Sequence, residues 1–170
     1  ERLDAVHRKL ADKGVDVNNP WLTLHAGVSE AKREYPVPSW IEAGKRIVSE
    51  LGYQIVLTGT SKEASLAQAI QSGIGTGAYS LAGAFTMEEL ITVIDESPLL
   101  ICVNTGPAHI AAAVQTPAIV LYALTNPQHA PWRTSGTVLP YSIPEAHESR
   151  NEVLRFVKKK YFEKKSIVVP

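Results

Sequence analysis

The strongest candidate for chemistry is the stretch Asn104-Thr-Gly-Pro-Ala-His109, which follows a buried apolar run and opens a helical pattern. Thr105 or Asn104 can cap that helix, and Gly106 has no Cβ to block a ligand. Proline suits the first helical turn, and the free N–H groups and dipole of a helix N-terminus attract phosphate. The stretch therefore predicts an anion site with His109 one turn further on. The alternative is an ordinary, well-capped turn between a strand and a helix.

A second candidate is the stretch His25-Ala-Gly-Val-Ser-Glu-Ala-Lys-Arg33. A strand ends here in a loop that contains Gly27 and then two adjacent cations, Lys32 and Arg33. Lysine or arginine at such a place can neutralise a diphosphate. The alternative is a solvated basic pair on a surface loop.

A third candidate is the stretch Leu57-Thr-Gly-Thr-Ser-Lys-Glu63, where Thr58 and Gly59 end a strand. Glu63 lies near the start of the next helix, where the helix dipole favours a carboxylate, and it could also accept both hydroxyls of a ribose. Parallel strands bring their carboxyl ends to one edge of a sheet, where ligands bind in open α/β folds. The three stretches together thus predict a single anion-binding crevice.

The remaining candidate residues give weaker indications of function than these three stretches. Phe85 could pack on a base or simply in the core, and His129 could border a second substrate. The lysines at 158–160 and 164–165 could touch anionic lipid, although a solvated helix face is the favoured interpretation. The sequence contains no GxGxxG and no Walker A motif, so neither of those phosphate-binding fingerprints applies.

The elements that must position these residues alternate between short apolar runs and helical patterns, which is typical of βαβ units and a parallel sheet. The expected strands are 21–26, 54–58, 79–81, 99–103 and 118–122. The expected helices are the first dozen residues, 39–49, 61–71, a segment from 86 to before 98, 107–114 and 145–161. Ser39, Ser61 and Thr86 could cap three of them, with Glu42 and Glu89 at the capping-box positions after Ser39 and Thr86. Residues between the last strand and the last helix are expected to form a long loop.

Composition sets the limits of these interpretations. The chain has 170 residues, of which 45% are apolar, and its 17 basic residues balance 17 acidic ones. No global charge therefore points to nucleic acid. Cys102 is the only cysteine, which excludes an internal disulfide, and the histidines are not spaced for a metal. No apolar stretch approaches the roughly 20 residues that span a bilayer. Because the chain begins with Glu1, we expect it to be part of a longer protein.

In this order and spacing, the blocks resemble glycosyltransferase family 9, the ADP-heptose:lipopolysaccharide heptosyltransferases. The chain departs from the family pattern at three points: Ala26 replaces a proline, Glu34 separates the basic pair from the aromatic residue, and Asn104 replaces an aspartate. The matching blocks are His25–Ser29, Lys32-Arg33, Tyr35-Pro36, Thr58-Gly59 with Glu63, Leu81–Gly83, Thr86-Met87, Asn104–Ala113 and Leu121–Pro127.

The resemblance implies an α/β fold, a Rossmann-like parallel sheet flanked by helices that forms the C-terminal half of a GT-B fold. Residues 1–170 would be one nucleotide-sugar-binding domain, with an opening helix in 1–20 and a C-terminal helix and tail in 144–170. The diphosphate would lie among Thr105, Gly106 and His109, with the ribose on Glu63 and the adenine near Phe85. The implied donor-binding residues are His25, Gly27, Lys32, Arg33, Thr58, Gly59, Glu63, Phe85, Asn104, Thr105, Gly106 and His109.

The implied activity is inverting glycosyl transfer from a nucleotide-sugar donor to a glycolipid acceptor, with no metal, no cofactor and no nucleic acid. The family's general base lies in an N-terminal acceptor domain, so this chain alone is expected to be inactive. The implied location is the cytoplasm, peripherally at the inner face of the inner membrane. Two alternatives remain: another GT-B nucleotide-sugar enzyme such as an epimerase, or a non-catalytic nucleotide-binding module, which Asn104 would suit.

Overall fold

The chain folds around one six-stranded sheet in which every neighbouring pair is parallel, in the order β3-β2-β1-β4-β5-β6. The computed structural model describes residues 2–123, 135–144, 146 and 150–162, except for the side chains of residues 32, 161 and 162. The strands are β1 (Trp21–His25), β2 (Gln54–Thr58), β3 (Ala78–Ser80), β4 (Leu100–Val103), β5 (Ala118–Ala123) and β6 (Gly136–Tyr141).

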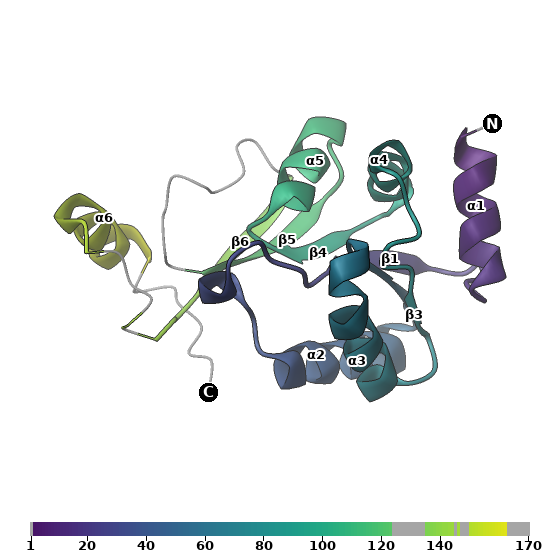
Figure 1. Cartoon of the computed structure of the whole chain (residues 1–170), viewed down its shortest axis with the longest axis horizontal. Helices are drawn as coiled ribbons and strands as arrows, with labels where there is room; N and C mark the ends of the chain where they lie inside the picture. The colour runs from purple at the N-terminus through teal and green to yellow at the C-terminus, as the bar shows by residue number, and fades with distance from the viewer. Residues whose placement is uncertain (1, 124–134, 145, 147–149, 163–170) are drawn as a thin grey trace.

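Helices cover both faces of the sheet (Figure 1). They are α1 (Arg2–Asp12), η1 (Ala31–Arg33), α2 (Val37–Leu51), η2 (Ser61–Glu63), α3 (Ala64–Ile74), α4 (Met87–Glu96), α5 (Gly106–Val114), α6 (Glu152–Val157) and the π-helical η5 (Lys158–Phe162). In Figure 1, α2 and α3 lie on one side of the sheet and α4 and α5 on the other, with α1 beyond α4. None of the helices in the described ranges is long and apolar enough to cross a membrane.

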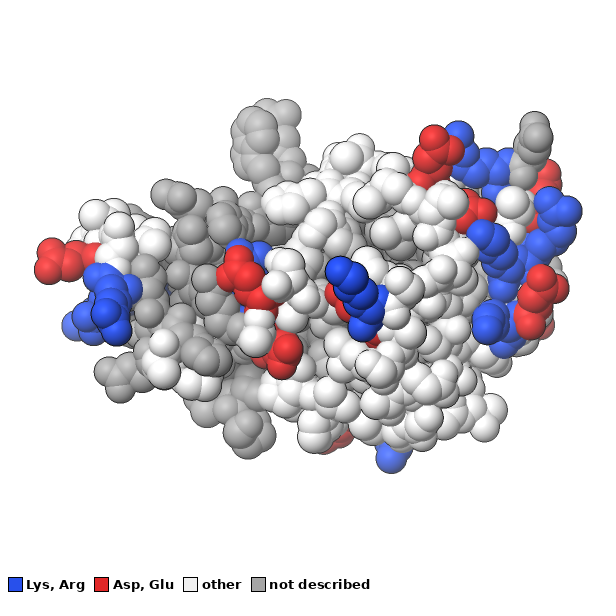
Figure 2. All heavy atoms as spheres, in the orientation of Figure 1, with Lys and Arg blue, Asp and Glu red and all other residues white. Residues whose placement is uncertain are grey.

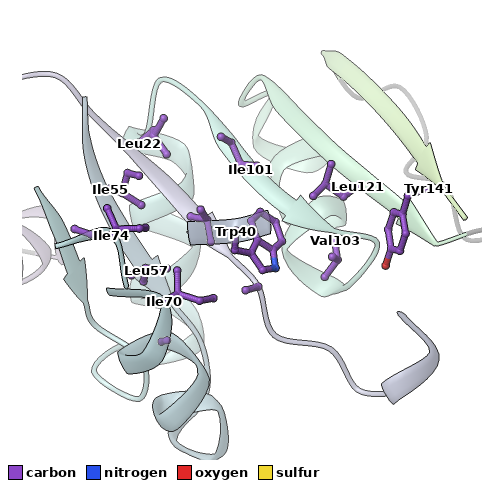
Figure 3. Packing of buried hydrophobic residues seen from close by; sticks show 14 of the residues in the cluster. Leu22, Trp40, Ile55, Leu57, Ile70, Ile74, Ile101, Val103, Leu121 and Tyr141 are labelled. Carbon is purple, nitrogen blue, oxygen red and sulfur yellow. The ribbon is translucent and has the colours of Figure 1, made fainter. Parts of the chain in front are cut away.

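The core follows from the two-residue period of the strands. In β1, Leu22 and Leu24 belong to the cluster around Trp40 of α2, whereas Trp21 faces the opposite side, with Val6 and Leu10 of α1. Figure 3 shows Trp40 beneath the middle of the sheet, among side chains from several strands. A third cluster joins β4 and β5 to α4 and α5. Both faces of the sheet are therefore buried, as parallel sheets require.

The strand order reverses between β1 and β4, which are direct neighbours although two other strands lie between them in the sequence. His25, the last residue of β1, pairs with Cys102 of β4, so both strands end at the same height. A crevice opens beyond the carboxyl ends of strands at such a switch point, because the connections leave in opposite directions. The fold thus brings the loops after β1 and β4 together.

The predicted parallel α/β architecture is confirmed, and all five expected strands are present within one or two residues of their predicted bounds. The structure corrects two helix starts. Helix α2 begins at Val37 with no capping side chain, two residues before the expected start at Ser39. After β2, Thr60 rather than Ser61 forms the capping box, with Glu63.

The region expected to be a long loop contains the sixth strand, β6. Pro140 argues against a strand because proline lacks the N–H that a ladder uses. Here β6 is the edge of the sheet and pairs only with β5, so one side of its backbone needs no ladder partner. The last helix is also shorter than expected: α6 begins at Glu152, where the Asn151 side chain caps it.

Candidate functional site

A cavity of about 670 Å³ lies at the carboxyl ends of β1 and β4. The three stretches singled out in the sequence all contribute residues to its wall. The structure therefore brings the three turns together, as predicted. The lining residues are His25, Gly27, Val28, Ser29, Arg33, Thr60, Lys62, Glu63, Met87, Leu90, Asn104, Thr105, Gly106, Pro107 and His109.

The N-terminus of α5 forms one side of this cavity. Gly106 is the first residue of the helix, its φ is ordinary, and a Cβ built on it would meet no atom within 4 Å. Pro107 has no N–H, and Ala108 donates its own N–H to the carbonyl of Thr105 at 3.0 Å. Gly106 is therefore the residue of this first turn whose N–H can serve a ligand, together with the dipole of the helix.

The side chains before α5 do not cap it, contrary to expectation. Thr105 is the N-cap residue, but its hydroxyl donates to the carbonyl of Val103 at 3.4 Å and accepts no cap hydrogen bond. Asn104 is only 2% exposed, and both polar atoms of its amide lack a hydrogen-bond partner among the described residues. Buried polar groups are almost always satisfied in native proteins, and Asn104 belongs to the cavity lining, so its amide is a candidate for pairing with a bound ligand.

The loop after β1 places a guanidinium beside this turn. Arg33 of η1 forms an ion pair with Glu30, with Nη2 and Oε1 3.1 Å apart. Its Nη1 approaches the backbone carbonyl of Asn104 at 3.5 Å. The side chain of Lys32 lies outside the described part of the structure. The Arg33 contacts show that the basic loop and the Asn104 turn are adjacent.

The carboxylate of Glu63 joins the loops after β1 and β2. Its Oε2 accepts hydrogen bonds from the Thr60 N–H at 2.6 Å and from the Thr60 hydroxyl at 2.9 Å. A Cβ on Gly27 would collide with this carboxylate, so the glycine permits the two loops to meet. The other oxygen, Oε1, lies directly against Gly27 at the cavity wall.

His25 contributes a buried imidazole to the cavity lining. It is 6% exposed, and its Nδ1 lies 3.1 Å from the hydroxyl of Thr58, its partner in the β1–β2 register. Burial lowers the pKa of His25 below its ordinary value, while the nearby charge of Glu63 acts in the opposite direction. The ring is suited to hydrogen bonding rather than to carrying charge.

Eight of the twelve donor-binding residues implied by the resemblance line this cavity: His25, Gly27, Arg33, Glu63, Asn104, Thr105, Gly106 and His109. Thr58 and Gly59 do not line the cavity but contact residues that do: Thr58 contacts His25, and Gly59 lies close to the side chain of Glu63. Phe85 does not line the cavity and instead packs against the cluster that contains Val6 and Leu10. His129 and the lysines at 164–165 lie outside the described residues.

Lys62, Met87 and Leu90 are among the lining residues that were not expected as donor-binding residues. Lys62 is an exposed cation within the third stretch, three residues after Gly59. Met87 and Leu90, from the first turn of α4, give the cavity an apolar wall, and Met87 is 65% exposed. The sequence signal for this wall was the methionine that directly follows Thr86, the expected cap of the helix.

Titratable groups elsewhere offer little chemistry. Cys102 is buried in β4, and burial raises the pKa of its thiol to about 12, so it is an inert core residue. Within the described residues, no group of histidine, cysteine, aspartate or glutamate side chains could hold a metal ion.

The strand order, the switch-point cavity and the glycine at a helix N-terminus are those of a Rossmann-like α/β fold. The family model for glycosyltransferase family 9 (heptosyltransferase) matches residues 2–159, so the chain belongs to this family. Among curated proteins, it is 44% identical over 85 residues to lipopolysaccharide heptosyltransferase 3 of Escherichia coli, covering 48% of this chain and 24% of that protein.

Solved structures agree on the fold. A family 9 glycosyl transferase from Veillonella parvula matches 95% of this chain and 46% of its own, with a TM-score of 0.75 and 18% identity. The Escherichia coli heptosyltransferase WaaC, solved with ADP, matches 91% of this chain and 47% of its own, with a TM-score of 0.65 and 19% identity. The chain thus spans less than half the length of these proteins. The predicted fold class, a Rossmann-like sheet of the GT-B heptosyltransferases, is confirmed.

Proposed function

We propose that this chain is the donor-binding half of a heptosyltransferase that takes an ADP-heptose-like nucleotide sugar and acts in lipopolysaccharide assembly. Family membership supports the reaction class, and the names of its relatives support the acceptor class. The single observation that carries the donor role is the switch-point cavity. Its lining includes the open face of Gly106, Asn104 with its unpaired side-chain amide, and Arg33, whose guanidinium approaches the Asn104 backbone carbonyl.

The diphosphate would lie at the N-terminus of α5. Gly106 leaves room for phosphate oxygens to approach the backbone, because nothing lies within 4 Å of the position a Cβ would take. Arg33 and Lys62 line the same cavity and supply positive charge, and His109 lies one turn along the helix. Since only Gly106 offers an N–H in this turn, these side chains must provide much of the binding energy.

The nucleoside would extend from the diphosphate toward α4. Glu63 has one carboxylate oxygen in the capping box and the other at the cavity wall, where it could accept a ribose hydroxyl. Met87 and Leu90 form the apolar wall against which a base would pack. Phe85 directly precedes the capped turn that carries both side chains, so it would support the base from behind.

The chemistry that these residues can supply is leaving-group stabilisation. When an acceptor hydroxyl attacks the anomeric carbon, the sugar–phosphate bond breaks and charge accumulates on the departing diphosphate. The cations and the α5 dipole would stabilise that charge, without a metal ion. The proton of the acceptor would go to a base outside this chain, so the chain alone would bind donor but transfer nothing.

Calorimetric titration with nucleotides tests this proposal. We expect ADP to bind, UDP and NAD to bind much more weakly, and His109→Ala to weaken ADP binding while the melting temperature stays unchanged. A preference for UDP would instead favour another nucleotide-sugar enzyme such as an epimerase. Absence of binding by every nucleotide would contradict a donor site. Added EDTA is expected to leave ADP affinity unchanged.

A further inference from the structure

The first helix contacts the turn that carries the apolar wall of the cavity, although it lines no part of the cavity itself. The ammonium of Lys9 in α1 donates to the carboxylate of Glu89 at 2.7 Å and to the carbonyl of Ala84 at 2.8 Å. It also lies 5.9 Å from the centre of the Phe85 ring. A single side chain thus contacts residues on both sides of the turn at the start of α4.

That turn is held by a capping box in which Glu89 has two partners. Its Oε2 accepts the Thr86 N–H at 2.8 Å as well as the Lys9 ammonium, while the Thr86 hydroxyl accepts the Glu89 N–H at 3.2 Å. The Lys9 ammonium and the Thr86 amide both hold the pKa of Glu89 below its usual range. The carboxylate is therefore charged, and both of its hydrogen bonds are charge-assisted.

The same turn presents Met87 and Leu90 to the cavity, one residue and four residues after Thr86. Met87 is largely exposed, so packing against the core does not fix its position. Leu90 packs against the core cluster of β4, β5 and α5, so it is the position of Met87 that depends most on the backbone of the turn. Glu89 holds that backbone through its hydrogen bond with the Thr86 N–H. Lys9 of α1 is the second partner of this Glu89 oxygen and joins it to another helix.

A second ion pair joins the same two helices and provides a matched comparison. Arg2 of α1 lies 3.0 Å from Glu88 of α4, but both side chains are more than half exposed and Glu88 takes no part in the capping box. Figure 2 shows charged side chains of both signs gathered over α1, whereas toward the middle of this face they occur as small separate groups among uncharged residues. Exposed pairs of this kind contribute little to stability.

We propose that Lys9 is a positioning residue for nucleobase binding: through Glu89 and the Ala84 carbonyl, it sets the turn that places Met87 and Leu90 against the base. This inference rests on the proposed donor function, because it assumes that a base occupies the apolar wall. The phosphate end of the cavity is built from other elements, the η1 loop and α5, which Lys9 does not contact.

The experiment compares ADP with inorganic pyrophosphate by calorimetry, for the full chain and its variants. We expect Lys9→Met to weaken ADP binding about tenfold, since it removes charge-assisted hydrogen bonds, and to leave pyrophosphate binding unchanged. Lys9→Arg, which keeps the donors and the charge, should restore most of the ADP affinity. Arg2→Met should bind both ligands like the wild type.

Equal weakening of both ligands by Lys9→Met would overturn the proposal, because it would indicate a general structural role. So would unchanged ADP binding. Hydrogen exchange provides a readout without ligand: the Thr86 amide should exchange faster in Lys9→Met than in Arg2→Met, and equal rates would contradict the proposal. If the wild type binds pyrophosphate but not ADP, or binds neither, the proposed donor function fails, whatever the exchange rates show.

Discussion

The hydroxyl of Tyr141 donates a 2.6 Å hydrogen bond to the backbone carbonyl of Arg33. Tyr141 is the last residue of β6 at the sheet edge, and Arg33 lies in the η1 loop that follows β1, so the bond joins parts of the chain that are 108 residues apart. Tyr35 packs edge-on against Tyr141 and against Trp40, with ring centres 5.2 and 5.1 Å apart. Burial raises the pKa of Tyr141, so its hydroxyl stays a donor.

Tyr141→Phe should therefore destabilise the fold and loosen the basic loop. Removing the donor leaves a carbonyl without its partner, and we expect the free energy of unfolding to fall by about 1–2 kcal/mol. Pyrophosphate should also bind more weakly, because Arg33 is less well positioned. Urea denaturation and calorimetry measure the two effects.

The matched control is Tyr79→Phe, in β3 at the opposite edge of the sheet, because the Tyr79 hydroxyl makes no hydrogen bond to any described residue. It should leave both quantities close to wild type. Equal losses in the two variants would show that the Tyr141 hydroxyl has no special part in holding the loop.

Gly106→Ala should separate stability from binding. The added methyl group meets no protein atom and removes the flexibility of glycine, so the free energy of unfolding should stay the same or rise by up to about 1 kcal/mol. The same methyl group would occupy the place expected for phosphate oxygens, and ADP affinity should fall at least about tenfold. Thermal denaturation and titration of one preparation check both parts.

Gly52→Ala should have the opposite effect to Gly106→Ala, lowering stability without changing ADP binding. Gly52 ends α2 with φ at 71°, where an alanine is strained although no atom blocks it. We expect a loss of about 1 kcal/mol in stability with normal ADP binding. If Gly106→Ala behaved in the same way, the open face of Gly106 would have no connection with phosphate.

Asn104→Leu should keep the chain folded and abolish the contact that its amide offers. Since neither polar atom of this buried amide is paired among the described residues, replacing it with an apolar group of similar size should cost little and could stabilise the protein without ligand. We expect ADP-sugar binding to weaken while the midpoint of urea unfolding is maintained. A large loss of stability in the absence of ligand would mean that the amide serves the fold.

His25 predicts a fall in stability under mildly acidic conditions. Burial lowers its pKa in the folded state, so below about pH 6.5, its ordinary value, the unfolded chain binds the proton more readily than the folded one. The free energy of unfolding should therefore be constant above this pH and decrease as the pH falls toward the folded pKa. Urea denaturation from pH 8 to pH 5 should show this slope in the wild type and a smaller one in His25→Gln. The same dependence of stability on pH in both proteins would contradict a lowered pKa of His25 in the folded state.

The sequence was sufficient to predict the convergence of three turns, because strand polarity alone determines which ends of a parallel sheet meet. It was also sufficient for the Thr86–Glu89 capping box, since that motif is local. Strand β6 was missed because Pro140 argues against a strand. An edge strand tolerates proline, but only the assembled sheet shows which strand is at the edge. Whether Lys62 and Met87 line the cavity depends on how their turns lie over the sheet, which the periodicity of the sequence does not encode.

A crystal structure of the protein with ADP tests the central claim most directly, since the claim concerns where the diphosphate lies. The account predicts phosphate oxygens within hydrogen-bonding distance of the Gly106 N–H and beside Arg33, with the adenine against Met87. ADP bound away from the carboxyl ends of β1 and β4, or with its phosphates remote from the start of α5, would contradict it.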